Sequence, residues 1–211
     1  MSCVSDPCPA LSPFSIALPC PILLADGTQE WRLNGTLHRL DGPAVIYANG
    51  SKEWYLDGDL HRLDGPAILH ADGTEAWFFH GNRHRLDSPA FVGSDGIQQW
   101  YVDGRLHRLD GPARIWANGD QEWFVDDMRH RLDGPAVINS NGWQQWCVDG
   151  RRHRLNGPAV IHSNGSEEWW VDDCNITDLS AHEKMAYIRA YVEAMTPASI
   201  AHPPELLVRE P

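Results

Sequence analysis

The chain has 211 residues, of which 42% are hydrophobic, and a formal net charge of −12 at pH 7. This length suits one ordinary domain or one repeat array, and the acidic balance argues against nonspecific binding to nucleic acid or to anionic membranes. The five cysteines (Cys3, Cys8, Cys20, Cys147 and Cys174) are too sparse for a disulfide scaffold and form no CxxC pair, so a reducing cytoplasm is expected.

Residues 1–20 are predicted to form an extended N-terminal segment. The first 24 residues contain no Lys or Arg, and their apolar stretch is interrupted by Pro13, Pro19 and Pro21. Such a stretch is a poor signal peptide and too broken for a membrane span. We therefore expect no secretion and no membrane insertion, and a cytoplasmic protein (in the host cytoplasm if it is viral).

A 23-residue period runs through residues 21–175 and predicts a repeat array made of a half unit and six full units. The heptapeptide HRLDGPA begins at residues 38, 61, 107 and 130, with HRLDSPA at 84 and HRLNGPA at 153. A tryptophan column has the same step: Trp31, Trp54, Trp77, Trp100, Trp123, Trp146 and Trp169. A fixed period of this length indicates structural units that stack on their neighbours.

Turn signals divide each unit into strands. In the stretch AVIYANGSKEWYLDG we expect strands at 44–47 and 52–57, a turn near 49–50 and a second turn at 57–58, because Asn-Gly and Asp-Gly between apolar runs favour hairpins. The predicted fold is all-β: an elongated antiparallel β-hairpin array, a meander of about fourteen strands.

Strand alternation sorts the side chains of each unit into two faces. One face is always apolar, as with Trp54, Leu56, Ala44 and Ile46, and is the expected core. The other face carries an aromatic residue flanked by acids or amides and varies between copies, which is typical of a binding surface. We expect the following residues of that face to bind a protein partner: Glu53, Tyr55, Asp57, Phe78, Tyr101, Asp103, Trp116, Glu122, Phe124, Asp126 and Trp170.

The period ends at VDDCNITD, and residues 176–197 are predicted to form a capping helix. Ser180 and Glu183 have the spacing of a capping box, and an apolar stripe follows at Met185, Ile188, Val192 and Met195. This helix would cover the last open strand. Residues 198–211 are expected to be a loose tail.

The heptapeptide itself combines His, Arg and Asp, but its pattern does not favour chemistry. Equivalent histidines in successive units would stand roughly 9–10 Å apart, too far to share a metal ion. Asn156 replaces the acid in the last copy, and no phosphate loop or nucleophile motif is present. We predict no enzyme activity, no metal and no cofactor. Instead, Arg62 and Asp64 are expected to form an ion pair that braces the joint between units, and Ser88 in a glycine position suggests that the glycine provides space.

Trp54, Gly58, His61, Gly65 and Gly73, with their counterparts, make the unit resemble a MORN-type repeat. The spacing from Trp to Gly is one residue longer than in that family, and Arg follows His where Gly is usual. The closest description is the MORN-like HRxDGPA variety, familiar from bacteriophages and large DNA viruses. The resemblance implies an elongated β-hairpin array and noncatalytic binding.

Together these features predict a noncatalytic protein-interaction scaffold. We expect a phage-type accessory protein that binds, and inhibits, a basic or nucleic-acid-binding host protein through its acidic-aromatic face, without contacting nucleic acid directly. Two alternatives stay open: a binder of glycans or choline-like ligands, which aromatic ladders suit, and a structural element of a virion. The sequence leaves the oligomeric state open.

Overall fold

The computed structural model describes residues 21–196, which fold into short antiparallel strands followed by one helix. The predicted extended segment 1–20 and the predicted tail 198–211 lie outside the described residues, as does Pro197. Two compact parts are distinguished: an N-terminal part that ends at Asp127 and a C-terminal part that begins at Met128. The prediction of an all-β hairpin array with a C-terminal helix is confirmed.

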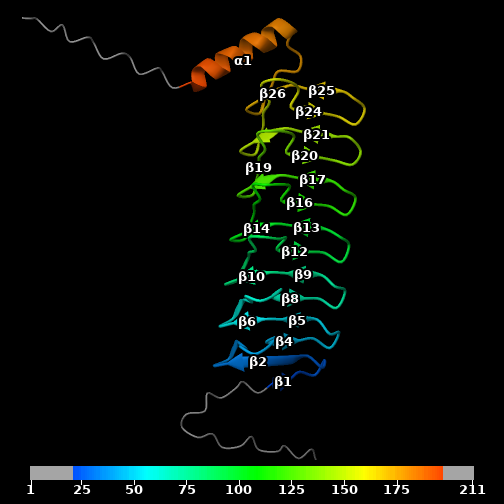
Figure 1. The fold of residues 1–211 in the computed structure, drawn as a ribbon, viewed down its shortest axis with the longest axis vertical. Helices are drawn as coiled ribbons and strands as arrows, with labels where there is room; N and C mark the ends of the chain where they lie inside the picture. Colours follow the sequence, from blue (N-terminus) through cyan, green and yellow to red (C-terminus); the bar gives the residue numbers. More distant parts are fainter. Residues whose placement is uncertain (1–20, 197–211) are drawn as a thin grey trace, which may run out of the picture. The chain divides into compact units, whose positions relative to one another are not determined.

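In the N-terminal part, the main sheet runs in chain order, each strand antiparallel to the next (Figure 1). Its strands are β1 (Pro21–Leu23), β2 (Gln29–Leu33), β4 (Val45–Ile46), β5 (Lys52–Glu53), β8 (Ile68–Leu69), β9 (Glu75–Ala76), β12 (Phe91–Val92), β13 (Gln98–Gln99), β16 (Arg114–Ile115) and β17 (Gln121–Glu122).

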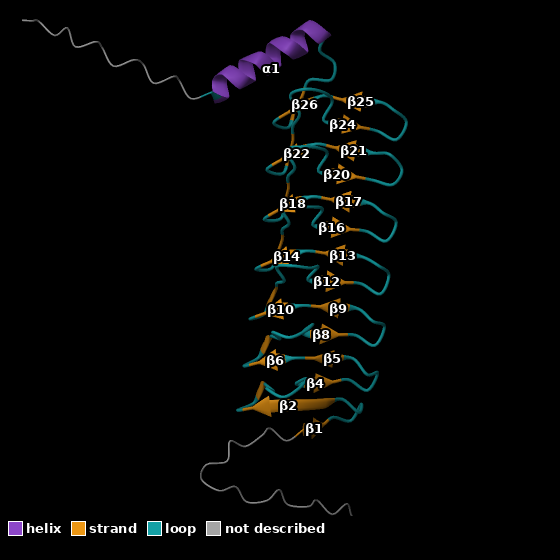
Figure 2. Cartoon of the chain, in the orientation of Figure 1, coloured by secondary structure: helices purple, strands orange, loops and turns teal. Residues whose placement is uncertain are grey.

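A second set of strands forms small hairpins beside this sheet. β3 (Thr36–Leu37) pairs with the end of β2, and three separate hairpins follow: β6 (Tyr55–Leu56) with β7 (Asp59–Leu60), β10 (Phe78–Phe79) with β11 (Asn82–Arg83), and β14 (Tyr101–Val102) with β15 (Arg105–Leu106). β18 (Phe124–Val125) is the last strand of this part. Most of the chain between these two-residue strands is loop and turn (Figure 2).

Each repeat therefore contributes four short strands, whereas the sequence predicted two. The predicted strand 52–57 is divided at Trp54 into β5 and β6, which belong to different sheets. Backbone bonding continues through this corner, because the Trp54 N–H donates to the Ala67 carbonyl at 2.8 Å and its carbonyl accepts from the His61 N–H at 3.0 Å. The change of direction at Trp54 has a consequence for which side chains are buried.

The two kinds of turn differ in geometry. Asp57 and Gly58 both have positive φ, 52° and 92°, as the tight two-residue turn of the small hairpin requires. In the turn at Asn49-Gly50, only Gly50 has positive φ, 89°, and the Asn49 side chain accepts a hydrogen bond from the Ser51 N–H at 2.9 Å. Asn and Asp serve equally well as this acceptor, which accounts for their exchange between copies.

Successive repeats are joined by recurring backbone hydrogen bonds. The Arg39 N–H donates to the Tyr55 carbonyl at 3.1 Å, and the Gly58 N–H donates to the Leu37 carbonyl at 2.9 Å. One repeat later, the Gly81 N–H donates to Leu60 at 3.0 Å. The same joint therefore recurs along the array.

The alanine that ends each heptapeptide has no exposed surface in any copy: Ala44, Ala67, Ala90 and Ala113 in the N-terminal part, and Ala136 and Ala159 in the C-terminal part, are all 0% exposed. Because this position is fully buried, a larger side chain there would overpack the core.

The C-terminal part repeats the pattern with β19 (Met128–Arg129), β20 (Val137–Ile138), β21 (Gln144–Gln145), β22 (Cys147–Val148), β23 (Arg151–Arg152), β24 (Val160–Ile161), β25 (Glu167–Glu168), β26 (Trp170–Val171) and β27 (Cys174–Asn175). β20, β21, β24 and β25 form a sheet in that order, and β22–β23 and β26–β27 are hairpins. Helix α1 (Ala181–Met195) follows.

Helix α1 begins with the predicted capping box, in which Ser180 and Glu183 satisfy each other's backbone N–H groups. The helix starts later than in the predicted range 176–197, because its N-cap is Ser180, and it ends at Met195. Of the predicted apolar stripe, only Ile188 is buried. The stripe prediction is wrong for the other members, Met185, Val192 and Met195, which are exposed.

Candidate functional site

In five of the six heptapeptides, the arginine lies over the ring of the tryptophan eight residues before it. Arg39, Arg62, Arg85 and Arg108 lie 4.0 to 4.1 Å from the ring centroids of Trp31, Trp54, Trp77 and Trp100, and Arg154 lies 3.9 Å from that of Trp146. This cation–π contact covers one face of each ring.

The same guanidinium group forms the predicted ion pair. Arg62 Nε donates to Asp64 Oδ1 at 2.9 Å, and Arg62 Nη1 donates to the Pro66 carbonyl at 3.3 Å. The hydrogen bond from Arg62 holds the pKa of Asp64 below its ordinary value. Because the Arg and Asp of this heptapeptide are engaged with each other and with the bend, their role is structural.

The glycine of the heptapeptide provides space for this arginine, as the sequence suggested. A Cβ at Gly65 would lie 2.8 Å from Arg62 Cζ, and Gly65 does not have positive φ. In the third copy Ser88 occupies the glycine position, and among the described contacts Arg85 keeps its bond to the Pro89 carbonyl but makes none to Asp87.

The histidine of each heptapeptide contacts the turn of the next small hairpin. Nδ1 lies 2.8 to 3.0 Å from the Oδ1 atom of the turn aspartate in the pairs His38–Asp57, His84–Asp103, His107–Asp126 and His130–Asp149. These pairs were not predicted from the sequence, although the constant separation of 19 residues between each histidine and its aspartate could have indicated them. The histidines therefore connect one repeat to the next.

Residues 21–196 contain no group of three or more His, Cys, Asp and Glu side chains that could hold a metal ion. Over the same residues, no helix is long and apolar enough to cross a membrane.

The predicted acidic-aromatic face is only partly exposed. Glu122 and Phe124 are only 6% and 8% exposed, so the prediction that they face solvent is wrong. Half-buried members of the set are Glu53, Tyr55, Phe78, Tyr101 and Trp170. Exposed members are Asp57, Asp103, Trp116 and Asp126.

The corner at Trp54 explains this outcome. Glu53 pairs in register with Val45, which is only 3% exposed, so both side chains lie on the enclosed side of the main sheet. Across the corner, the Tyr55 hydroxyl donates to Glu53 Oε2 at 2.9 Å, and burial together with this carboxylate raises the pKa of Tyr55. The aromatic residue and the acid therefore satisfy each other inside the repeat.

Two other copies use the same two positions in the same way. The Tyr101 hydroxyl donates to Gln99 at 3.1 Å, and Trp170 Nε1 donates to Glu168 at 2.8 Å. The rings of Phe78 and Phe124, at the same position in two further copies, have no hydrogen-bond donor.

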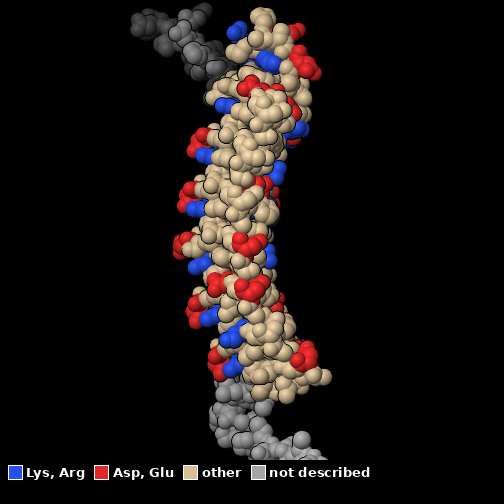
Figure 3. Space-filling view, turned by 90° about the vertical axis from the view of Figure 1, so that its right-hand side faces the viewer, with Lys and Arg blue, Asp and Glu red and all other residues tan. Residues whose placement is uncertain are grey.

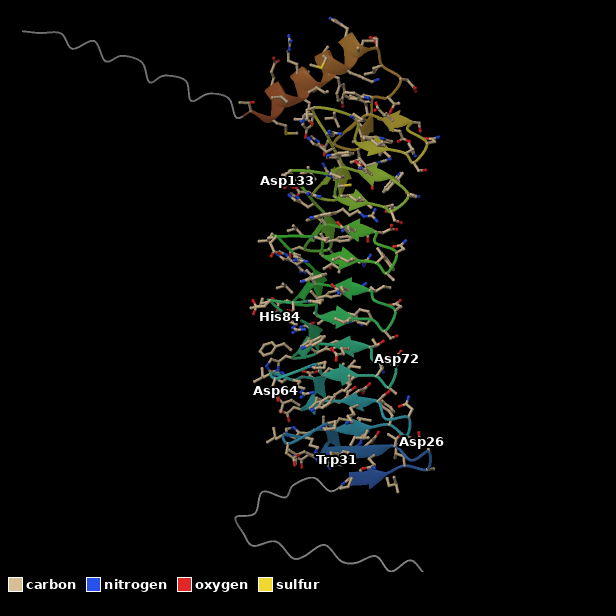
Figure 4. The ribbon with its side chains drawn as sticks, turned by 45° about the vertical axis from the view of Figure 1, so that its right-hand side comes forward. Asp26, Trp31, Asp64, Asp72, His84 and Asp133 are labelled. Atoms are coloured by element: carbon tan, nitrogen blue, oxygen red, sulfur yellow. The ribbon has the colours of Figure 1, made fainter. Side chains whose placement is uncertain are left out.

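The leucine at the third position of the heptapeptide is a surface residue that was not predicted from the sequence. Leu40, Leu63, Leu86 and Leu109 are 71 to 81% exposed in the N-terminal part, and Leu132 is 80% exposed in the C-terminal part. Asp64 and His84, which mark the edge with the heptapeptide bends, lie opposite the turn residues Asp26 and Asp72 (Figure 4).

The fold places the chain among all-β hairpin repeat proteins. No protein-family model matches the sequence, and no curated protein is similar to it at a significant level. The MORN-like resemblance and the viral origin that it suggests stay predictions.

Proposed function

We propose that this chain is a noncatalytic scaffold that binds a basic protein partner. The observation that supports this proposal best is a row of exposed turn aspartates in the N-terminal part. The side chains of Asp57, Asp103 and Asp126 are 78%, 78% and 52% exposed, although each contacts a histidine. They recur in the same turn of their repeats, with His80 in the intervening copy.

Carboxylates held at multiples of the repeat spacing, two repeats from Asp57 to Asp103 and one from Asp103 to Asp126, favour a partner with matching basic side chains. Repeats lie roughly 9–10 Å apart, and the net charge of −12 adds a long-range attraction for a cationic surface. In the cell this scaffold would be a cytoplasmic accessory protein, of phage type, that inhibits the host protein it binds. The glycan and choline alternatives receive less support, because most of the aromatic rings that would form their platform are buried or half-buried.

The test compares two triple variants with equal charge changes. Asp57→Asn, Asp103→Asn and Asp126→Asn remove the row, and the fold tolerates Asn there because Asn34 has the same conformation, φ 52°. The control changes three aspartates in the turns of the main sheet, Asp26, Asp72 and Asp95, to Asn. Two other copies already have asparagine at this turn position, Asn49 and Asn118.

Tagged full-length chains would be used to capture proteins from host-cell extract, with quantitative mass spectrometry and a salt series. We expect the wild type and the control to capture the same basic protein and the row variant to lose it, with retention that weakens as salt increases. Equal capture by both variants would contradict the proposal.

A further inference from the structure

The exposed leucines form a regular row for which the fold shows no need. All six heptapeptides have leucine at this position. The neighbouring Arg, Asp and Gly make the contacts that hold the bend, whereas Leu40, Leu63 and Leu109 are each 81% exposed. A single exposed leucine is ordinary, but the same exposed side chain in successive repeats forms an apolar row of the kind that marks an interaction site.

Grooves lie between neighbouring leucines of the row. The groove between Leu40 and Leu63 has a volume of about 570 Å³, and Trp54, Leu56 and His61 contribute to its lining. Corresponding grooves between Leu63 and Leu86, and between Leu86 and Leu109, have volumes of about 700 and 520 Å³. The row therefore alternates apolar projections with grooves whose linings combine aromatic and aliphatic side chains with the arginines and aspartates of the heptapeptides.

The last copy of this surface is covered, and the covering element is a helix of the same chain. Leu155, the sixth leucine of the row, is half-buried and packs against a buried cluster that contains Val171 from β26, Ile176, and Ile188 from α1. Tyr191, one turn after Ile188, packs against the same cluster.

Helix α1 also makes aromatic and cation–π contacts at this position. The ring centroids of Tyr191 and His153 lie 5.5 Å apart, and Lys184 Nζ lies 5.4 Å from the ring centroid of Trp169. The repeat of Trp169 has Thr177 at the position where the other repeats have arginine. The residues used by α1 are Lys184, Ile188 and Tyr191, which the spacings i, i+4 and i+7 place on one helix face.

We infer that the leucine row of the N-terminal part, formed by Leu40, Leu63, Leu86 and Leu109, is a docking surface for an amphipathic helix of a protein partner. The helix would lay an aliphatic and an aromatic side chain between leucines, as Ile188 and Tyr191 do beside Leu155. Binding of a helix through residues spaced three and four apart is a common mode of peptide recognition.

The charges beside the row favour a helix with basic flanks. The side chains of Asp64 and Asp110 are 83% and 84% exposed, so their outer oxygens face solvent even though Arg62 and Arg108 pair with them. Acidic and basic side chains lie next to each other, rung after rung, along one edge in Figure 3. A lysine of the partner helix would meet these carboxylates. This inference rests on the proposed protein-binding function but uses a different surface from the turn aspartates.

The experiment measures binding of a fluorescent, stapled helical peptide with the sequence of residues 179–196 to the full-length chain by anisotropy. A scrambled stapled peptide of equal composition is the control ligand. The test variant combines Leu40→Ser, Leu63→Ser, Leu86→Ser and Leu109→Ser, which should leave the fold intact because these side chains are exposed. Leu23→Ser, at a residue that is 71% exposed outside the row, is the control variant.

We expect the wild type and Leu23→Ser to bind the helical peptide. The variant with four leucines replaced should bind it at least about tenfold more weakly, because the apolar contacts of the leucines are lost. The triple variant with Asp57→Asn, Asp103→Asn and Asp126→Asn should bind the peptide as tightly as the wild type does. Absence of binding by the wild type, or equal binding of the scrambled peptide, would overturn the inference.

Two further outcomes separate this inference from the proposed function. If the turn-aspartate variant loses the peptide and the leucine variant keeps it, the leucine row is wrong and the acidic surface is favoured. If sedimentation shows that the wild type self-associates and the leucine variant does not, the row binds a second copy of this chain, and the assignment to a partner helix is overturned.

Discussion

Replacing Phe124 with alanine distinguishes an interior aromatic residue from a binding residue. The ring is 8% exposed and packs in a cluster with Trp100 and Leu106, with the Arg114 guanidinium 5.4 Å from its centroid. Deleting a buried phenylalanine ring costs about 3–5 kcal/mol, because apolar contact is lost and a cavity remains. The matched control is Leu109→Ala, since Leu109 is 81% exposed; it should cost less than about 1 kcal/mol.

Urea unfolding followed by circular dichroism measures both effects. For a denaturant slope of about 2 kcal/mol/M, Phe124→Ala should lower the unfolding midpoint by about 1.5–2.5 M. If Phe124→Ala leaves the midpoint close to that of the wild type, the reasoning that places this ring in the interior is refuted.

Three further predictions concern the bends and the cysteines. The pKa of Asp64 is depressed from its ordinary value of 3.8, so its ion pair stabilises the fold above that pH and the stabilisation is lost as the pH falls. The urea midpoint of Asp64→Asn should therefore fall less steeply than that of the wild type between about pH 5 and pH 2. Equal slopes for the two proteins would contradict this prediction. Gly111→Ser should cost about 0.2–1 kcal/mol by displacing the arginine from its aspartate, while Ser88→Gly should restore such a pair and raise the unfolding midpoint; a stabilising Gly111→Ser would count against the spatial role of glycine. Burial raises the pKa of Cys147 to about 11, so peptide mapping after iodoacetamide treatment at neutral pH should find Cys174 modified and Cys147 protected until urea is added; early modification of Cys147 would disagree with its burial.

The period, the turns and the capped helix were predictable from the sequence because each depends on local chemistry. Asp57-Gly58 can form its turn without help from distant residues, and Ser180 with Glu183 can start a helix in the same way. The ion pair between Arg62 and Asp64 spans only two residues.

The identity of the enclosed face was not predictable, because it depends on a change of chain direction. Strand alternation correctly places Glu53 and Tyr55 on one side of the chain, where they bond to each other. It does not tell which side is the more enclosed one, because the chain changes direction at Trp54 between two sheets and leaves both residues half-buried. The exposed leucine could not be recognised either, since an invariant apolar residue in a repeat usually indicates the core.

The recurring backbone joint has a consequence for how such a protein changes in evolution. The bond from Gly58 to Leu37 is repeated from Gly81 to Leu60, so the end of one repeat fits the start of any other. Recombination between coding copies could then remove or add whole repeats without creating an unmatched junction. Homologous chains would differ in repeat number, and each change would alter the number of heptapeptide leucines along the array.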